Sequence, residues 1–186
     1  AYTAWWQMDS KLSAPKNSNL KTVMDFSFFD KINTAKNEQT ETWFKGLDRV
    51  YNNFVYDFLY PNPASVLAFI ENHDTDRFLG EGDNLPMLKQ ASTLLLTTRR
   101  IPQLYYGTEI MMNGVKSKSD GYVRKDFPGG WTGDTETALT AAGRSKIQNE
   151  CYNFYKTLLN WRKGNDVIAK GNMVQFMVQN GVYAYA

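Results

Sequence analysis

A short apolar run at residues 66–70 (VLAFI) constrains the fold of this chain more than any other stretch, because a dense group of polar residues follows it at once. Pro61 and Pro63 stand in front of the run, and Gly80 and Gly82 stand behind the polar group. An apolar run of this length between turn-forming residues predicts a buried strand, covered on both faces as in a parallel sheet. Polar side chains at the carboxyl end of such a strand have the position of an α/β active site.

The polar group reads ENHDTDR at residues 71–77, and it contains His73, the only histidine of the chain, beside Asp74. From the residue types alone two interpretations stay open: an active-site loop, or a solvated loop in which one aspartate caps the next helix. A third pattern, Asp-x-Asp at residues 74–76, would suit a magnesium-dependent phosphatase, but it leaves the strand predicted at residues 101–106 without a role.

Composition excludes several other classes of protein. The length of 186 residues predicts one domain or slightly more, and a hydrophobic content of 42% is enough for a packed core. The net charge is +2 and the basic residues are spread along the chain, which argues against nucleic-acid binding. A single cysteine, Cys151, and a single histidine argue against an internal disulfide and a zinc site. No apolar run approaches the length of about 18 residues that a membrane span needs.

Apolar periodicity predicts strands and helices in alternation after an irregular start at residues 1–19. The clearest helix covers residues 40–60, where Thr40 can cap the start, Pro61 stops the helix, and one apolar stripe contains Trp43, Leu47, Val50, Phe54 and Phe58. Alternation at this spacing argues for parallel βα units. In chain order we predict a strand at 20–26, the helix at 40–60, the strand at 66–70, a helix at 85–99, a strand at 101–106 and a helix at 145–163.

Two later segments depart from the alternation. Residues 111–143 form a loop too long for a simple connection, and such loops are often functional. Residues 173–186 alternate around Asn180-Gly181, which predicts a β-hairpin. The change of pattern predicts a second domain that begins near Asn165, so we divide the chain into residues 1–164 and residues 165–186.

Three segments carry a resemblance to a known family. Residues 69–77 (FIENHDTDR) resemble the fourth sequence signature of the alpha-amylase family of glycoside hydrolases, a hydrophobic strand that ends in Asn-His-Asp and has an Arg three residues on. Residues 101–109 (IPQLYYGTE) are similar to the signature of the family's eighth barrel strand, with Arg100 where the family usually has glycine. The loop at residues 120–131 (DGYVRKDFPGGW) is similar to the neopullulanase and cyclomaltodextrinase branch.

The resemblance implies an α/β fold, a partial (β/α)8 TIM barrel that holds the last three strands and helices, followed by the start of an all-β domain. Residues 20–26, 66–70 and 101–106 would be the sixth, seventh and eighth strands. On this alignment the chain starts after the fifth strand. The segment at 20–26 would then be an open apolar edge, so we expect the chain to self-associate.

The resemblance also implies roles for individual residues in a retaining hydrolase of α-1,4-glucosidic bonds in maltodextrin, cyclodextrin or pullulan. Asp74 would be the third catalytic carboxylate, which binds sugar hydroxyls and helps to distort the ring, and His73 would hold the same hydroxyls. Asn72 and Arg77 would bind substrate, although Arg77 would alternatively pair with a carboxylate. We expect Glu109 to brace the loop, and Asp25, Glu71 and Asp76 to be structural or solvated.

Two parts of the family's machinery have no match here. The nucleophile normally stands in a Gly-x-Arg-x-Asp string, which this chain lacks, and the acid/base glutamate would fall just before Ala1. The chain alone is therefore expected to be inactive. The alternatives are a glucanotransferase, which the motifs do not separate from a hydrolase, and a non-catalytic carbohydrate-binding or structural relative. We expect an α-glucan as partner, no evident cofactor, with calcium possible in the full-length protein, and a periplasmic or secreted location.

Overall fold

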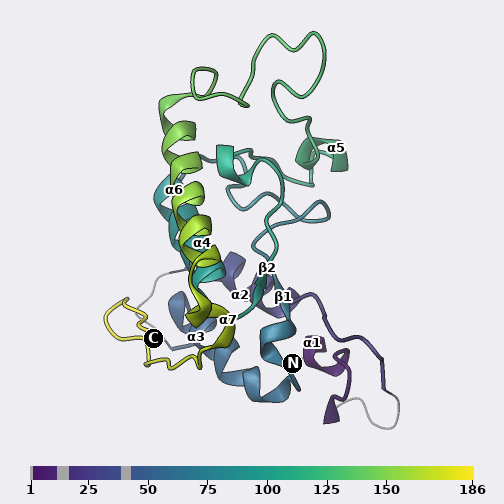
Figure 1. Ribbon diagram of the computed structural model, residues 1–186, viewed down its shortest axis with the longest axis vertical. Helices are drawn as coiled ribbons and strands as arrows, with labels where there is room; N and C mark the ends of the chain where they lie inside the picture. The colour runs from purple at the N-terminus through teal and green to yellow at the C-terminus, as the bar shows by residue number, and fades with distance from the viewer. Residues whose placement is uncertain (1, 12–16, 39–42) are drawn as a thin grey trace. The chain divides into compact units, whose positions relative to one another are not determined.

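The structure is a computed structural model that describes residues 2–11, 17–38 and 43–186 (Figure 1). It divides into two compact units, the first made of Ala1–Ile70, Thr97–Gln103 and Asn165–Ala186, and the second of Glu71–Leu96 and Leu104–Gly164. The elements in chain order are α1 (Tyr2–Trp5), α2 (Phe26–Ala35), α3 (Leu47–Val55), the 3-10 helices η2 (Tyr56–Leu59) and η3 (Pro63–Ser65), β1 (Leu67–Ala68), α4 (Leu85–Thr97), β2 (Ile101–Pro102), the 3-10 helix η4 (Thr108–Ile110), α5 (Asp120–Val123), α6 (Lys146–Lys163) and α7 (Asp166–Lys170).

The first unit contains a small parallel sheet. β1 pairs with β2 in parallel, with Leu67 opposite Ile101. Met24 forms a parallel bridge to Leu67 on the other side of β1. Three successive segments of the chain therefore run side by side in the same direction, which confirms the predicted parallel βα order. The residues around β1, from Val66 to Ile70, are buried except for Leu67, which is half-buried, so the prediction of a buried strand is also confirmed.

The strand predicted at residues 20–26 is wrong apart from the single bridge at Met24. Helix α2 begins at Phe26, because the carboxylate of Asp25 caps it by accepting the backbone N–H of Phe28 at 2.9 Å. The residue after such a cap belongs to the helix, so an extended strand cannot continue through residue 26. Asp25 is fully buried, as the structural interpretation of this residue predicts.

The helix predicted at residues 40–60 is shorter, because α3 begins at Leu47 and gives way to η2 at Tyr56. Phe44 and Gly46 have φ values of 62° and 55°, which the interior of a right-handed helix does not allow. The stripe is correspondingly short, since Val50 and Phe54 are buried while Trp43 and Phe58 are exposed. The proposed cap, Thr40, lies outside the described residues.

A buried ionic cluster ties the elements of the first unit together. The Arg100 guanidinium, at the start of β2, pairs with Asp25 at the cap of α2 and with Asp57 in η2, the latter at 2.5 Å. Arg99 also pairs with Asp57. The guanidinium carbon of Arg100 lies 4.8 Å from the centre of the Phe54 ring, which adds a cation–π contact. Burial raises the pKa of Asp57 to about 7, against the effect of Arg99, and lowers the pKa of Arg100 to about 9.

In the second unit, α4 packs against α6, and Figure 1 shows the two helices side by side. Ser92 of α4 shares a hydrogen bond with the Tyr155 hydroxyl, and Lys89 pairs with Glu150 at 2.6 Å. The structure thus confirms the helices predicted at residues 85–99 and 145–163. Ser145 starts α6 with a complete capping box, which the sequence pattern did not specify.

The apolar face that the sequence predicts for α6 is only partly buried. Cys151 is buried, but Ile147 and Trp161, which share its apolar spacing, are exposed. Burial raises the pKa of the Cys151 thiol to about 12, so this cysteine is a packing residue rather than a nucleophile.

The predicted hairpin near the C-terminus is confirmed by two antiparallel bridges, Gln175 to Tyr185 and Gln179 to Val182. Asn180 and Gly181 have φ values of 51° and 72°, the left-handed pair that a two-residue hairpin turn requires. The short helix α7 was not predicted. The domain boundary near Asn165 stays a prediction.

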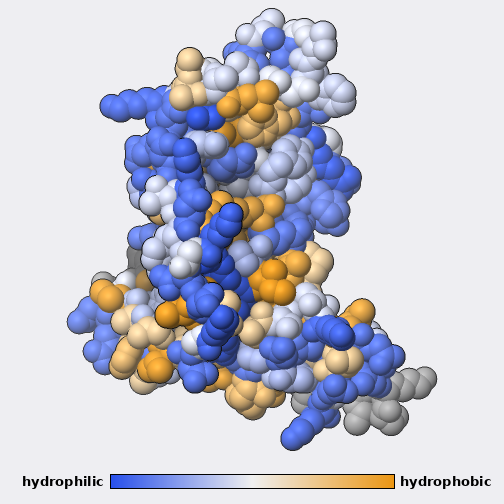
Figure 2. Space-filling model, viewed as in Figure 1, coloured by the Kyte–Doolittle hydropathy of each residue, from blue (hydrophilic) through white to orange (hydrophobic). Residues whose placement is uncertain are grey.

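Among the described residues, no helix is both long and apolar enough to cross a bilayer. On the face drawn in Figure 2, hydrophobic residues form separate patches between hydrophilic ones.

We predict that Arg100→Met lowers the free energy of unfolding by about 3–5 kcal/mol, because it leaves the buried carboxylate of Asp25 without its cation and takes from Asp57 one of its two arginine partners. Chemical denaturation followed by circular dichroism measures the change. Lys31→Met is the control, since Lys31 and Asp30 form an exposed pair worth less than about 1 kcal/mol. Equal stability of the two variants would contradict a structural role for the cluster.

Candidate functional site

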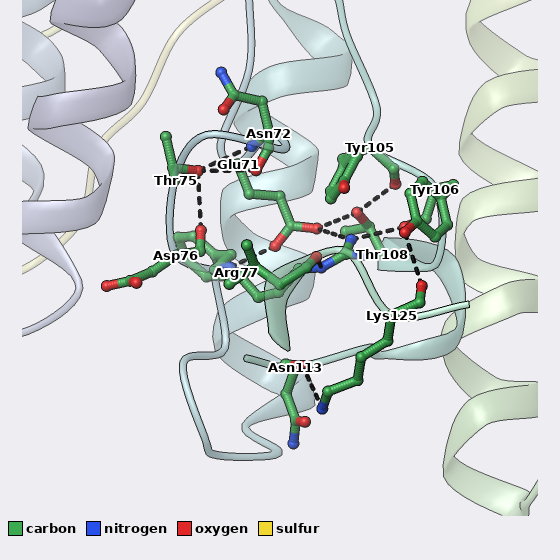
Figure 3. Close-up of polar contacts among 12 residues, drawn as sticks. Glu71, Asn72, Thr75, Asp76, Arg77, Tyr105, Tyr106, Thr108, Asn113 and Lys125 are labelled. Atoms are coloured by element: carbon green, nitrogen blue, oxygen red, sulfur yellow. Dashed lines mark hydrogen bonds and ion pairs between the residues drawn. The ribbon is translucent and has the colours of Figure 1, made fainter. Parts of the chain in front are cut away.

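The signature loop that follows β1 is built around the buried carboxylate of Glu71 in the second unit (Figure 3). One of its oxygens accepts from the Thr108 hydroxyl and lies 3.2 Å from an Arg77 nitrogen, and the other accepts from the backbone N–H of Phe78. Burial raises the pKa of Glu71, and these donors oppose the shift. The structural interpretation of Glu71 therefore agrees with its surroundings.

Arg77 is also buried, with 1% of its surface exposed. Besides Glu71, its guanidinium donates to the backbone oxygens of Val123 at 3.0 Å and Tyr106 at 2.7 Å, and its carbon lies 3.9 Å from the centre of the Tyr105 ring. Of the two roles that the sequence left open for Arg77, the structure shows the pairing with a carboxylate. In this arrangement the guanidinium has no surface to offer a sugar.

Asn72 shapes the loop from within. Its side chain is buried and its Oδ1 accepts the backbone N–H of Asp74 at 2.8 Å. The backbone N–H of Asn72 donates to Thr75 Oγ1 at 2.9 Å. An Asx turn of this kind holds the backbone in a fixed bend. The two residues at the bend, His73 and Asp74, are consequently turned outwards.

His73 and Asp74 are the exposed members of the predicted site, with more than half of each side chain accessible. His73 Nε2 lies 3.1 Å from one oxygen of Asp74. The other oxygen accepts from Arg124 Nη2 at 3.0 Å, and Arg124 Nε donates to the backbone oxygen of His73 at 2.9 Å. Arg124 also pairs with Asp120 at 3.2 Å.

Sequence reasoning did not identify Arg124 as a site residue. The only signal was indirect, because Arg124 belongs to the loop at residues 120–131 that carries the branch resemblance. Its partner Asp74 is distant in sequence, and such a contact has no local pattern. The structure therefore brings His73 and Asp74 together with Arg124 on the surface, and separates them from the buried Asn72 and Arg77.

This arrangement can bind a polyhydroxylated ligand. Exposed carboxylate, imidazole and guanidinium groups within hydrogen-bonding distance of one another supply both acceptors and donors. The loop beneath them is held by buried polar contacts, so the exposed groups are preorganised. Among the residues that the structure describes, no group of three or more His, Cys, Asp and Glu side chains could hold a metal ion, and we assign no residue to one.

Comparison with known proteins identifies the family. The sequence profile of the alpha-amylase family, described as alpha amylase, catalytic domain, matches residues 8–130. The chain is 33% identical to a cyclomaltodextrin glucanotransferase of Thermoanaerobacterium thermosulfurigenes, over 91% of this chain and 21% of that protein. It is 31% identical to an alpha-amylase of Niallia circulans, over 91% and 28%. The crystal structure of a gamma-CGTase from alkalophilic Bacillus clarkii matches with a TM-score of 0.64 and 25% identity, over 87% of this chain and 21% of that one.

The profile and the structural match define the class of protein as a catalytic barrel domain of the alpha-amylase type. The chain belongs to the alpha-amylase family, and its parallel segments and intervening helices form part of a (β/α)8 barrel. It spans only 21% and 28% of the length of these two curated relatives. The roles of Asp74, His73 and Asn72 stay predictions.

We predict that Glu71→Gln lowers the free energy of unfolding by about 1.5–3 kcal/mol, the value of hydrogen bonds to a charged group. The matched control is Glu81→Gln, because Glu81 is exposed and its pair with Lys118 is worth less than about 1 kcal/mol. Denaturant titrations of both variants measure the difference. A loss no greater than that of the control would show that the loop does not depend on Glu71.

Proposed function

We propose that the protein is a retaining glycoside hydrolase that cleaves α-1,4-glucosidic bonds in maltodextrin, cyclodextrin or pullulan. The observation that supports this most directly is the exposed His73–Asp74 pair at the end of a barrel strand in a chain of the alpha-amylase family. Ligands of parallel α/β barrels bind at the carboxyl ends of the strands. The substrate partner is therefore an α-glucan oligosaccharide or polysaccharide.

In this mechanism the residues of the chain bind and orient the sugar. The Asp74 carboxylate accepts hydrogen bonds from two neighbouring hydroxyls of the ring at the cleavage point, and His73 contacts the same hydroxyls. Arg124 keeps the carboxylate in place through its 3.0 Å contact. Hydrogen bonds of this kind strengthen as the ring distorts towards the oxocarbenium-like transition state, and they contribute several kcal/mol.

The nucleophile and the acid/base residue of a retaining enzyme lie about 5 Å apart across the scissile bond. No Gly-x-Arg-x-Asp string occurs in this chain, so we assign neither role to any of its residues. We accordingly expect these 186 residues to have no hydrolytic activity by themselves.

Glucan transfer is the second candidate, and it is compatible with the name of the relative from Thermoanaerobacterium, a cyclomaltodextrin glucanotransferase. Hydrolysis and transfer share the step that forms the glycosyl-enzyme, and they differ in whether water or a sugar hydroxyl completes the reaction. A non-catalytic relative would bind the glucan without cleaving it.

The proposal also includes a branch of the family and a location. The loop at residues 120–131 supports the neopullulanase and cyclomaltodextrinase branch, and the family resemblance supports a periplasmic or secreted location.

We predict that Asp74→Asn in the complete protein lowers kcat/KM for a maltodextrin about 100-fold or more, since each factor of ten corresponds to about 1.4 kcal/mol of lost transition-state binding. Release of reducing ends measures the rate, and chromatography of the products separates hydrolysis from transfer.

Asp76→Asn is the matched control for that prediction. Asp76 lies in the same loop, but its carboxylate accepts the backbone N–H of Lys116 at 2.6 Å, and asparagine can still accept there. Its kcat/KM should stay within about two-fold of the wild-type value. If Asp74→Asn is as active as Asp76→Asn, the assigned role of Asp74 is wrong.

Self-association of this chain stays a prediction. The apolar side chains of Leu20, Met24 and Phe26 are exposed in the segment where we expect pairing with a second copy. Sedimentation velocity of the 186-residue chain should therefore show species larger than a monomer. Met24→Lys should shift the distribution to monomers, whereas Lys21→Met should not; a monomeric wild type would contradict the prediction.

A further inference from the structure

A compact turn in the second unit presents a tryptophan to solvent. The carboxylate of Asp134 accepts the backbone N–H of Gly129 at 2.8 Å and that of Trp131 at 3.1 Å. The Asp134 N–H donates in return to the Trp131 oxygen at 3.2 Å, and Ala138 closes the turn by donating to the Pro128 oxygen at 2.9 Å. Both backbone polar groups of Trp131 are thus engaged inside the turn.

Packing adds to the rigidity of this turn. Gly129 has a φ of +87°, which favours glycine, and a Cβ at this position would stand 2.2 Å from Thr137 Oγ1. The backbone at Gly129 and Thr137 therefore approaches too closely for any other residue. A short loop that is both hydrogen-bonded and close-packed holds its side chains in a fixed direction.

Trp131 as a residue is nevertheless 66% exposed. Tryptophan is the largest apolar side chain, and leaving it in water forgoes the stabilisation that its burial would bring. A rigid support beneath an exposed indole is the arrangement expected of a binding platform, because little ordering entropy remains to be lost when a ligand binds.

The same segment is anchored to the candidate site. Arg124 contacts Asp74 and the backbone of His73, and the hydroxyl of Tyr106 donates to the Lys125 oxygen at 2.7 Å. An extended chain advances at most about 3.3–3.6 Å per residue, so Trp131 lies within roughly 25 Å of Arg124. That span is within reach of one oligosaccharide whose other end occupies the His73–Asp74 pair.

We propose that Trp131 is a stacking platform for a glucose ring of the same α-glucan chain, several units away from the bond that is cleaved. The flat indole face would cover the C–H face of a pyranose, and the indole N–H can donate to a hydroxyl. This assignment rests on the proposed function and adds a binding subsite to it. Trp131 makes substrate affinity depend on chain length, while Asp74 and His73 act on sugars of every length.

Kinetics of the complete protein with maltotriose and maltoheptaose test this assignment. For Trp131→Ala, the KM for maltoheptaose should rise about ten-fold, the scale of the lost burial of one aromatic face. Its kcat should stay within about two-fold, because a remote contact contributes equally to ground-state and transition-state binding. Because the proposal places Trp131 several sugar units from the cleaved bond, maltotriose held at the His73–Asp74 pair would not reach it, and its kinetic constants should not change. Trp131→Phe should restore most of the affinity for maltoheptaose.

Two further variants separate stacking from other effects. Trp43→Ala removes a tryptophan that is 74% exposed in the first unit, and it should leave the constants for both sugars unchanged. Asp134→Ala removes the acceptor that fixes the turn, so it should raise the KM for maltoheptaose alone, whereas Asp134→Asn keeps an acceptor and should have a smaller effect. Thermal melts check that each variant is folded.

The outcomes distinguish this inference from the function on which it rests. If the wild type cleaves maltoheptaose and Asp74→Asn impairs it, but Trp131→Ala matches the wild type on both sugars, the platform is overturned and the proposed function stands. An equal rise of KM for maltotriose and maltoheptaose in Trp131→Ala also overturns the platform. If the wild type cleaves neither sugar, the proposed function fails and the assignment of Trp131 fails with it.

Discussion

The Glu71 carboxylate is withdrawn from water, and a buried carboxylate is tolerated in a protein only when donors surround it. Here Arg77, Thr108 and the backbone N–H of Phe78 supply those donors. Glu71 stands at the start of the signature loop, Arg77 and Phe78 stand at its end, and Thr108 lies in the segment after β2, so these contacts fix the path of two loops. The outward position of Asp74 is a consequence of that fixed path, supported by the Asx turn at Asn72.

The first unit relies on the same physical rule. Arg100 occupies a position where the family usually has glycine, yet its guanidinium is fully buried. Such a group is stable only because Asp25 and Asp57 meet it, together with the face of Phe54. The arginine at this departure from the family pattern therefore carries the buried ionic contacts of the first unit. It links the start of β2 to the cap of α2 and to η2.

Local patterns predicted the elements whose stability is local. Helices α4 and α6 have sustained apolar spacing, and the turn at Asn180-Gly181 needs only the left-handed preference of those two residues. Prediction was poorer where a helix cap or a single backbone angle, rather than apolar periodicity, decides the conformation. Asp25 ends the strand expected at residues 20–26 because it caps α2, and the positive φ of Phe44 shortens the helix expected at residues 40–60. Neither effect has a periodic signature.

The sequence by itself determined the family, the parallel order of the strands and the identity of the exposed pair His73–Asp74, because these depend on contiguous strings of residues. Only the tertiary structure decided which polar side chains are available. It turned Arg77 inwards to pair with Glu71, and it brought Arg124 from a distant loop to Asp74. The reason is that burial and ion pairing depend on three-dimensional neighbours, so of two identical guanidinium groups one becomes a buried brace for Glu71 and the other an exposed partner of Asp74.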